Sequence, residues 1–159
     1  AEVYFLKSES ALAGLSALDA QEMYLEGIKM SMQQYGVGQT DADDYLATSA
    51  GTLAGTEEEK LEQIITQKWL AIYFQGNEGW AEYRRTGYSK ICTGSDKGNT
   101  DGKIPRRLTY PLEEYSKNEQ NVTEAATRIG GDKLLSRIWW DKKDGLPYSH
   151  PKQGMFPPD

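Results

Sequence analysis

Two consecutive helical patterns, at residues 57–75 and 78–85, constrain the fold of this chain more than any other feature. Thr56 and Glu59 have the spacing of a capping box at the start of the first pattern. Gly76-Asn77 forms a corner after it, and Gly87 stops the second. The apolar residues of the first pattern recur at intervals of three and four, as on one face of an α-helix; they are Leu61, Ile64, Ile65, Trp69, Ile72 and Tyr73.

The first 35 residues predict a helical hairpin. Residues 1–14 read as a helix with Val3, Phe5 and Leu6 among its apolar positions, and Gly14 stops it. Asp19 can cap a second helix that runs to about Tyr35. Such a pair is the repeating unit of tetratricopeptide-type stacks, although no second copy at a fixed period occurs in the sequence.

The remaining segments predict few regular elements. A short helix is expected at about 41–49, and Asn118 can cap a helix of about 119–129 that Gly130-Gly131 stops. Residues 93–103 read as a surface loop and 104–111, which ends in a proline, as extended chain. The fold class is therefore all-α, a tetratricopeptide-like helical hairpin scaffold with long irregular loops, and we expect one unit over residues 1–159.

Composition excludes several classes of protein. The net charge is -6, which argues against nucleic-acid binding through a basic face. A single cysteine, Cys92, excludes an internal disulfide and a cysteine-only metal site. No apolar run approaches the ~18–20 residues that span a bilayer. Because residue 1 already lies in a helical pattern without Met or an N-cap, we expect that an N-terminal portion, with any lipoprotein signal, is missing.

Five motifs occur in an order that resembles the SusD/RagB-like family of outer-membrane nutrient-binding lipoproteins. The chain departs from the family pattern at Ser8 and Ser10, and at Ser89, where the family often has proline. Because the motifs match the C-terminal part of the family, the resemblance implies that residues 1–159 are about the last third of a full protein. The motifs lie at Glu2–Leu12, Tyr24–Met32, Ile64–Ala71, Trp80–Tyr88 and Ile104–Glu114.

The resemblance also implies a function. Members of the family are lipid-anchored on the outer face of the outer membrane, here through a segment absent from this chain. They cover SusC-type TonB-dependent transporters, bind oligosaccharides or other nutrients such as peptides, and pass them on. They are not enzymes, and the resemblance implies neither a cofactor nor a metal. The expected partners are the transporter, the N-terminal portion of the same protein and the oligosaccharide or peptide ligand.

Most of the motif residues have a structural and a binding interpretation. Aromatic side chains at helical spacing usually pack in a core, but a flat ring also stacks on a sugar. Arginines hold carboxylates or backbone carbonyls, but they also bind anions. We favour structural roles for these motif residues: Gln67, Lys68, Trp69, Trp80, Glu82, Arg84, Arg85, Arg106 and Arg107.

The sequence does not assign the ligand-binding residues. Candidates are Trp139, Trp140 and Tyr148, because they lie near loops or the C-terminal tail. Packing against the missing N-terminal portion is the competing interpretation. The only histidine, His150, lies between a serine and a proline in the tail, a poor place for a preorganised base.

Two alternative functions are distinguishable from nutrient binding. An intracellular helical-repeat adaptor that binds protein segments would need further hairpins like 1–35 at regular spacing. A glycan-acting enzyme would need a carboxylate pair, and no pair stands out in an apolar setting. The acidic residues Asp41, Asp43 and Asp44 lack the glycine and distal glutamate of a calcium loop, so we interpret them as a solvated helix start.

Overall fold

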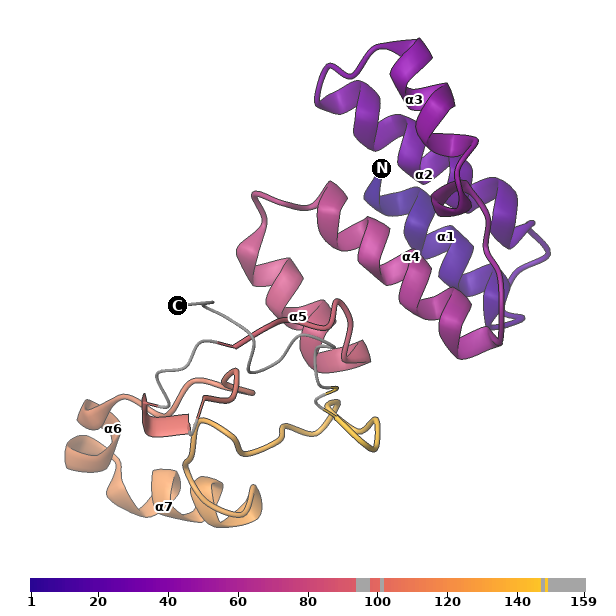
Figure 1. Ribbon diagram of the computed structural model, residues 1–159. Helices are drawn as coiled ribbons and strands as arrows, with labels where there is room; N and C mark the ends of the chain where they lie inside the picture. Colours follow the sequence, from indigo (N-terminus) through magenta and orange to yellow (C-terminus); the bar gives the residue numbers. More distant parts are fainter. Residues whose placement is uncertain (94–97, 101, 147, 149–159) are drawn as a thin grey trace. The chain divides into compact units, whose positions relative to one another are not determined.

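The structure, a computed structural model, describes residues 1–93, 98–100, 102–146 and 148 (Figure 1). Within these residues it contains α-helices and short 3₁₀ helices and no strand, which confirms the all-α prediction. The elements are α1 (Glu2–Leu12), α2 (Ala20–Gln34), α3 (Gln39–Leu46), η1 (Ser49–Gly51), α4 (Glu57–Ala71), α5 (Gly76–Thr86), η2 (Gly98–Thr100), α6 (Leu112–Lys117) and α7 (Glu119–Arg128).

The chain divides into two compact units, Ala1–Ser89 and Lys90–Asp159, where the sequence predicted one. The boundary follows the left-handed Gly87 that ends α5. This boundary precedes the polar segment 93–103. The change in composition at that segment therefore did not reveal the boundary. None of the helices in the described residues is long and apolar enough to cross a membrane.

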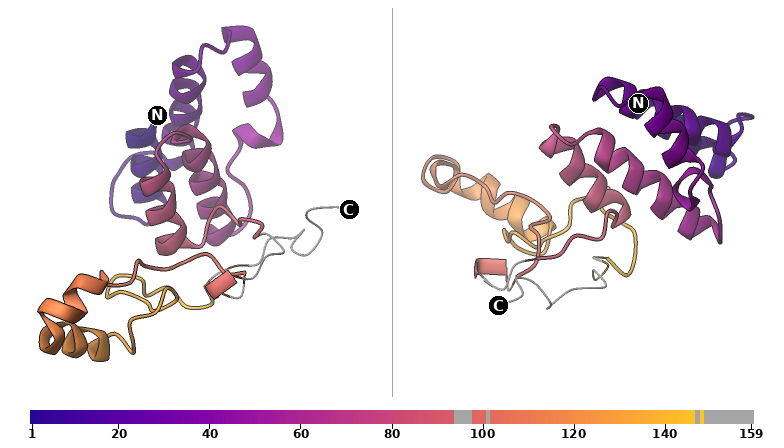
Figure 2. Two further views of the ribbon diagram at one scale, coloured as in Figure 1. Left: turned by 90° about the vertical axis from the view of Figure 1, so that its left-hand side faces the viewer. Right: turned by 45° about the horizontal axis from the view of Figure 1, so that its top comes forward.

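The core of the first unit lies between the hairpin α1–α2 and α4, which run side by side in Figures 1 and 2. The rings of Phe5 and Tyr24 meet edge to face at 6.3 Å, and Ile28, Ile64 and Ala71 complete the buried cluster. These five aromatic and aliphatic residues of α1, α2 and α4 form one buried cluster, so the tetratricopeptide-like hairpin prediction is confirmed. Val3, Leu6 and Tyr73, which the sequence placed on apolar faces, are exposed.

Polar side chains cap the N-termini of α2 and α4. The Asp19 carboxylate accepts from the Glu22 amide at 2.7 Å, and Thr56 and Glu59 form the reciprocal capping box. The predicted caps at Asp19 and Thr56 are therefore confirmed. Inside the hairpin, the buried Ser8 hydroxyl donates to the Ala20 carbonyl at 2.7 Å, so this departure from the family pattern ties α1 to the start of α2.

The corner between α4 and α5 differs from the prediction. α4 ends at Ala71 rather than at about residue 75, and Gly76, expected to break the helix, is the first residue of α5. The reason is a turn just before it, in which the Gln75 amide donates to the Ile72 carbonyl at 2.7 Å. The Gly87 stop is confirmed, with φ of 83° in the left-handed region.

The second unit contains α6 packed on α7, followed by irregular chain. α6 was not predicted, because it is six residues long and follows Pro111. Asn118 precedes α7 as predicted, but its side chain makes no capping bond; its oxygen accepts from the Asn121 amide group at 2.6 Å instead. The amides of Gly130 and Gly131 close the end of α7 with positive φ, as expected.

Candidate functional site

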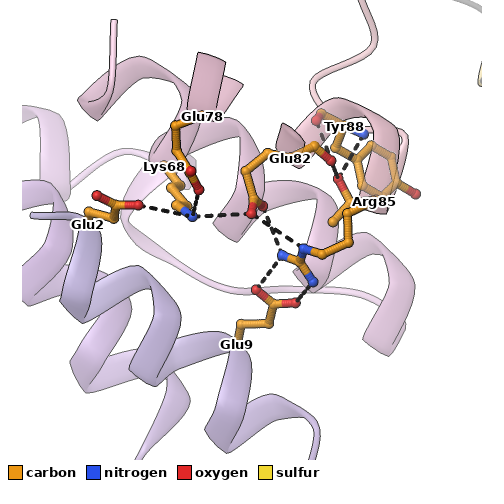
Figure 3. Close-up of polar contacts among 8 residues, drawn as sticks. Glu2, Glu9, Lys68, Glu78, Glu82, Arg85 and Tyr88 are labelled. Atoms are coloured by element: carbon orange, nitrogen blue, oxygen red, sulfur yellow. Dashed lines mark hydrogen bonds and ion pairs between the residues drawn. The ribbon is translucent and has the colours of Figure 1, made fainter. Parts of the chain in front are cut away.

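A cluster of ionic groups joins α1, α4 and α5 of the first unit. It consists of Glu2, Glu9, Lys68, Glu78, Glu82 and Arg85, and we call it the α1–α4–α5 ion cluster (Figure 3). At its centre the Lys68 side chain is only 1% exposed. Its ammonium group lies 3.2 Å from Glu78, 3.2 Å from Glu82 and 3.4 Å from Glu2. One buried cation therefore holds carboxylates of two other helices.

Glu82 links Lys68 to a second cation. Its other oxygen lies 2.8 Å from the Arg85 guanidinium, which also forms a two-pronged pair with Glu9 at 2.6 and 2.8 Å. Planar guanidinium and carboxylate groups match in this geometry, which adds orientation to the charge attraction. Arg85 and Glu9 lie 76 positions apart in the sequence, so the pair ties the first helix to α5.

The charge state of the cluster follows from these contacts. Burial alone would lower the pKa of Lys68, but the neighbouring Glu82 and Glu78 carboxylates outweigh it and raise that pKa above its ordinary value. Burial likewise opposes the charge of Arg85, and its hydrogen bonds to Glu9 and Glu82 raise its pKa overall. Both cations stay protonated near neutral pH, so neither can act as a general base. The cluster is suited to holding helices together.

The end of α5 is closed by short-range hydrogen bonds beside this cluster. The Thr86 hydroxyl donates to the Glu82 carbonyl at 2.8 Å and accepts from the Tyr88 amide at 3.1 Å. The Tyr88 hydroxyl reaches back to Glu58 on α4 at 2.7 Å. The motif from Trp80 to Tyr88 therefore shapes a buried corner rather than an open cleft.

A groove on the first unit runs beside Gln67, another motif residue. It has a volume of about 600 Å³ and lies among α2, η1 and α4. Gln67 donates to the Tyr45 hydroxyl at 2.7 Å, and the Tyr24 hydroxyl donates to the Ala50 carbonyl at 2.8 Å. Burial raises the pKa of Tyr24 to about 12, so this hydroxyl remains a donor at physiological pH.

Neither motif tryptophan lies in the buried core, contrary to the favoured interpretation. Trp69 and Trp80 are both half-buried. The Arg84 guanidinium stacks over the Trp80 ring at 3.8 Å from its centre and also donates to the Trp80 carbonyl at 3.3 Å. Trp69 lies against the start of α5, where a side chain at Gly79 would meet its ring at 3.5 Å.

The two arginines of the proline-flanked motif are paired within the second unit. Arg106 donates from Nε to Asp141 at 2.8 Å, and Arg137 donates to the same carboxylate at 2.8 Å. Arg107 pairs with Asp132, which also accepts from the Tyr115 hydroxyl at 2.8 Å. Burial alone would raise the pKa of Asp141 and of Asp132, but these hydrogen bonds outweigh it and hold both pKa values below the ordinary range.

A pocket in the second unit contains one of the ligand candidates. Its volume is about 460 Å³, and we call it the Trp139 pocket. The Trp139 side chain is 81% exposed, whereas Trp140 and Tyr148 are half-buried and do not line this pocket. Lys143 lies over the Tyr148 ring at 5.5 Å. The lining residues are Arg128, Ile129, Arg137, Ile138, Trp139, Asp141, Lys142 and Asp144.

Sequence reasoning missed most of the partners of the motif residues. Helical spacing alone could have suggested Glu82 with Arg85, which lie three positions apart on one helix. Nothing local points from Arg85 to Glu9 or from Arg107 to Asp132, because these pairs form only after folding. Within the described residues, no group of three potential ligands could hold a metal ion; His150 lies outside those residues.

Comparisons with known proteins identify relatives of this chain. The SusD-like family model described as "Starch-binding associating with outer membrane" matches residues 1–111. Among solved structures, a SusD homologue from Bacteroides uniformis is 36% identical with a TM-score of 0.77, over 89% of this chain and 36% of that one. A SusD-like protein of Bacteroidetes is 32% identical with a TM-score of 0.81, over 89% and 29%.

A third solved structure carries a ligand class in its name. It is a chitin-binding SusD homologue from Flavobacterium johnsoniae, 34% identical with a TM-score of 0.77, over 89% of this chain and 36% of that one. No curated protein matches the chain. The chain therefore spans about a third of the length of the structures it matches. The family match over residues 1–111 and the shared helical fold establish that this chain belongs to the SusD-like family.

Proposed function

We propose that this chain is the C-terminal portion of a cell-surface protein that captures glycan, or another nutrient such as peptide, without turning it over. The observation that carries the proposal is the family match over residues 1–111, whose description names starch binding and the outer membrane. The chitin-binding homologue at 34% identity supports a glycan as the ligand. Delivery to a SusC-type TonB-dependent transporter, and lipid anchoring through a segment outside this chain, complete the proposal.

The charges of the first unit support a scaffold role for it. Lys68 and Arg85 are engaged by carboxylates of α1 and α5, so the α1–α4–α5 ion cluster offers little free charge to a ligand. Breaking a buried ion pair of this kind typically costs about 3–5 kcal/mol, which is a reason to keep it intact rather than to use it for binding. Helices held in this way provide a rigid support for binding residues on irregular segments.

The second unit supplies the candidate binding surface. Trp139 presents an exposed ring beside charged side chains, the combination that binds the apolar face and the hydroxyl groups of a sugar. Trp140 and Tyr148, from the adjacent segment of the same chain, remain further candidates. We place Trp139 first because it is exposed and lines the Trp139 pocket.

Affinity purification of the intact protein from its native membrane tests the partner. We expect a SusC-type transporter to co-purify in near-stoichiometric amount after mild detergent extraction. A tagged outer-membrane lipoprotein from an unrelated family, purified in parallel, is the control for nonspecific recovery. Recovery of intracellular proteins without any transporter would instead identify an intracellular helical-repeat adaptor and contradict the proposal.

A further inference from the structure

We infer that the Trp139 pocket binds an acidic sugar, a hexuronate residue of a polysaccharide, through Trp139 and the side chains of Arg128 and Lys142. This inference rests on the proposed glycan-capture function and names its ligand class. The pocket, at about 460 Å³, falls within the usual range of small-molecule sites, roughly 300–1,000 Å³. Its lining combines an exposed aromatic ring with three cationic and two acidic side chains.

One of the two carboxylates in the pocket is already neutralised. Asp141 is 2% exposed and accepts hydrogen bonds from both Arg106 and Arg137. Its negative charge is therefore balanced within the unit and does not repel an incoming anion. Of the lining acids, Asp144 alone is left to face solvent, where it can accept hydrogen bonds from sugar hydroxyl groups.

Two cationic side chains of the pocket can pair with an anionic ligand. Arg128 and Lys142 are exposed, and neither has an ion-pair partner among the residues that the structure describes. Arg128 is not needed to satisfy the end of α7, because the Gly130 and Gly131 amides donate to the last carbonyls at 3.1 and 2.8 Å. A local excess of positive charge in a chain of net charge -6 favours an anionic ligand.

The aromatic ring favours a sugar over other carboxylates. Trp139 offers a wide flat surface to solvent, and the C–H face of a pyranose ring matches such a surface. A flexible acidic peptide carries its carboxylates on narrow side chains without a comparable flat face. A uronic acid ring joins a stacking face and a carboxylate in one rigid residue, so it can use Trp139 and the two cations together. Arginine recognises the planar carboxylate through paired hydrogen bonds.

Calorimetric titration of the intact protein tests this assignment with three probes: oligogalacturonate, chito-oligosaccharide and poly-glutamate. The key variant is the double substitution Arg128→Gln with Lys142→Gln. The matched control is Lys117→Gln with Lys133→Gln, which removes two exposed cations of the same unit outside the pocket. We expect the key variant to weaken oligogalacturonate binding about tenfold or more, since charge-assisted hydrogen bonds are lost. The control should leave the affinity unchanged, and Trp139→Ala should weaken binding as well.

The outcomes separate this inference from the proposed function. Binding of chito-oligosaccharide without binding of oligogalacturonate would overturn the acidic-sugar assignment and leave glycan capture standing. Equal affinity of the wild type and the key variant for oligogalacturonate would also overturn it. Tighter binding of poly-glutamate than of any sugar would reassign the pocket to acidic peptides. Absence of binding to both oligosaccharides and to poly-glutamate would contradict the proposed capture function itself.

Discussion

At the scale of single residues, Lys68 is the side chain on which the first unit depends most. It is fully buried, yet it is charged, and carboxylates from α1 and α5 surround it. Desolvation of a lysine is costly unless its charge is compensated. The sequence motif marked this lysine as important, but neither its burial nor its partner Glu2 could be predicted from spacing, because they depend on packing of helices that are distant in the sequence.

Replacement of Lys68 by Met should destabilise the first unit. The apolar side chain keeps most of the volume but leaves Glu2, Glu78 and the buried Glu82 without their shared cation. We expect a loss of about 3 kcal/mol in the free energy of opening of α1, α4 and α5. Native-state hydrogen exchange of the backbone amides in these helices measures this free energy of opening.

The control is Lys60→Met on the same helix, since Lys60 forms no ion pair with any described residue. Its hydrogen exchange should match that of the wild type. Equal protection in Lys68→Met and Lys60→Met would show that the α1–α4–α5 ion cluster contributes no stability, contrary to the interpretation given above.

At the scale of elements, the sequence correctly predicted the helix ends that depend on neighbouring residues. The caps at Asp19 and Thr56 and the stop at Gly87 were predicted correctly, because each depends on residues within one turn. The corner before α5 was misplaced because α4 ends in the turn between Ile72 and Gln75 and not at Gly76. The helix α6 was missed because six residues give no readable periodicity.

Close packing within the hairpin predicts the effect of Gly27→Ala. A Cβ atom at Gly27 would lie 2.7 Å from the Phe5 ring, which is fully buried. Because this buried ring would have to shift to admit the Cβ atom, we expect a loss of about 1–3 kcal/mol through overpacking. Thermal unfolding followed by circular dichroism should show a lower midpoint.

The matched control is Gly76→Ala in α5. A Cβ atom there meets nothing within 4 Å, and the residue is already helical. This substitution should leave the midpoint unchanged or raise it, because alanine favours the helix more than glycine does. If Gly27→Ala were as well tolerated as Gly76→Ala, the close contact between α1 and α2 would be refuted.

At the scale of the whole molecule, the order of the five motifs predicted the family, and the match over residues 1–111 confirmed it. The division into two units was not predicted, because the boundary at Ser89 carries no change of composition. The Trp139 pocket was only partly predicted: Trp139 was a candidate, but Arg128 and Lys142 come beside it through the fold of the chain after α7. Pockets of this kind gather residues from irregular segments, which periodicity does not describe.

Glycan capture without turnover is tested most directly by one titration of the intact protein with oligosaccharides, followed by chromatography of the same sample after prolonged incubation. We predict saturable binding to at least one oligosaccharide and recovery of that oligosaccharide at its original length. Shortened products that disappear when one carboxylate is replaced would establish a glycan-acting enzyme and contradict the prediction. Failure of the folded protein to bind any oligosaccharide would contradict glycan capture equally.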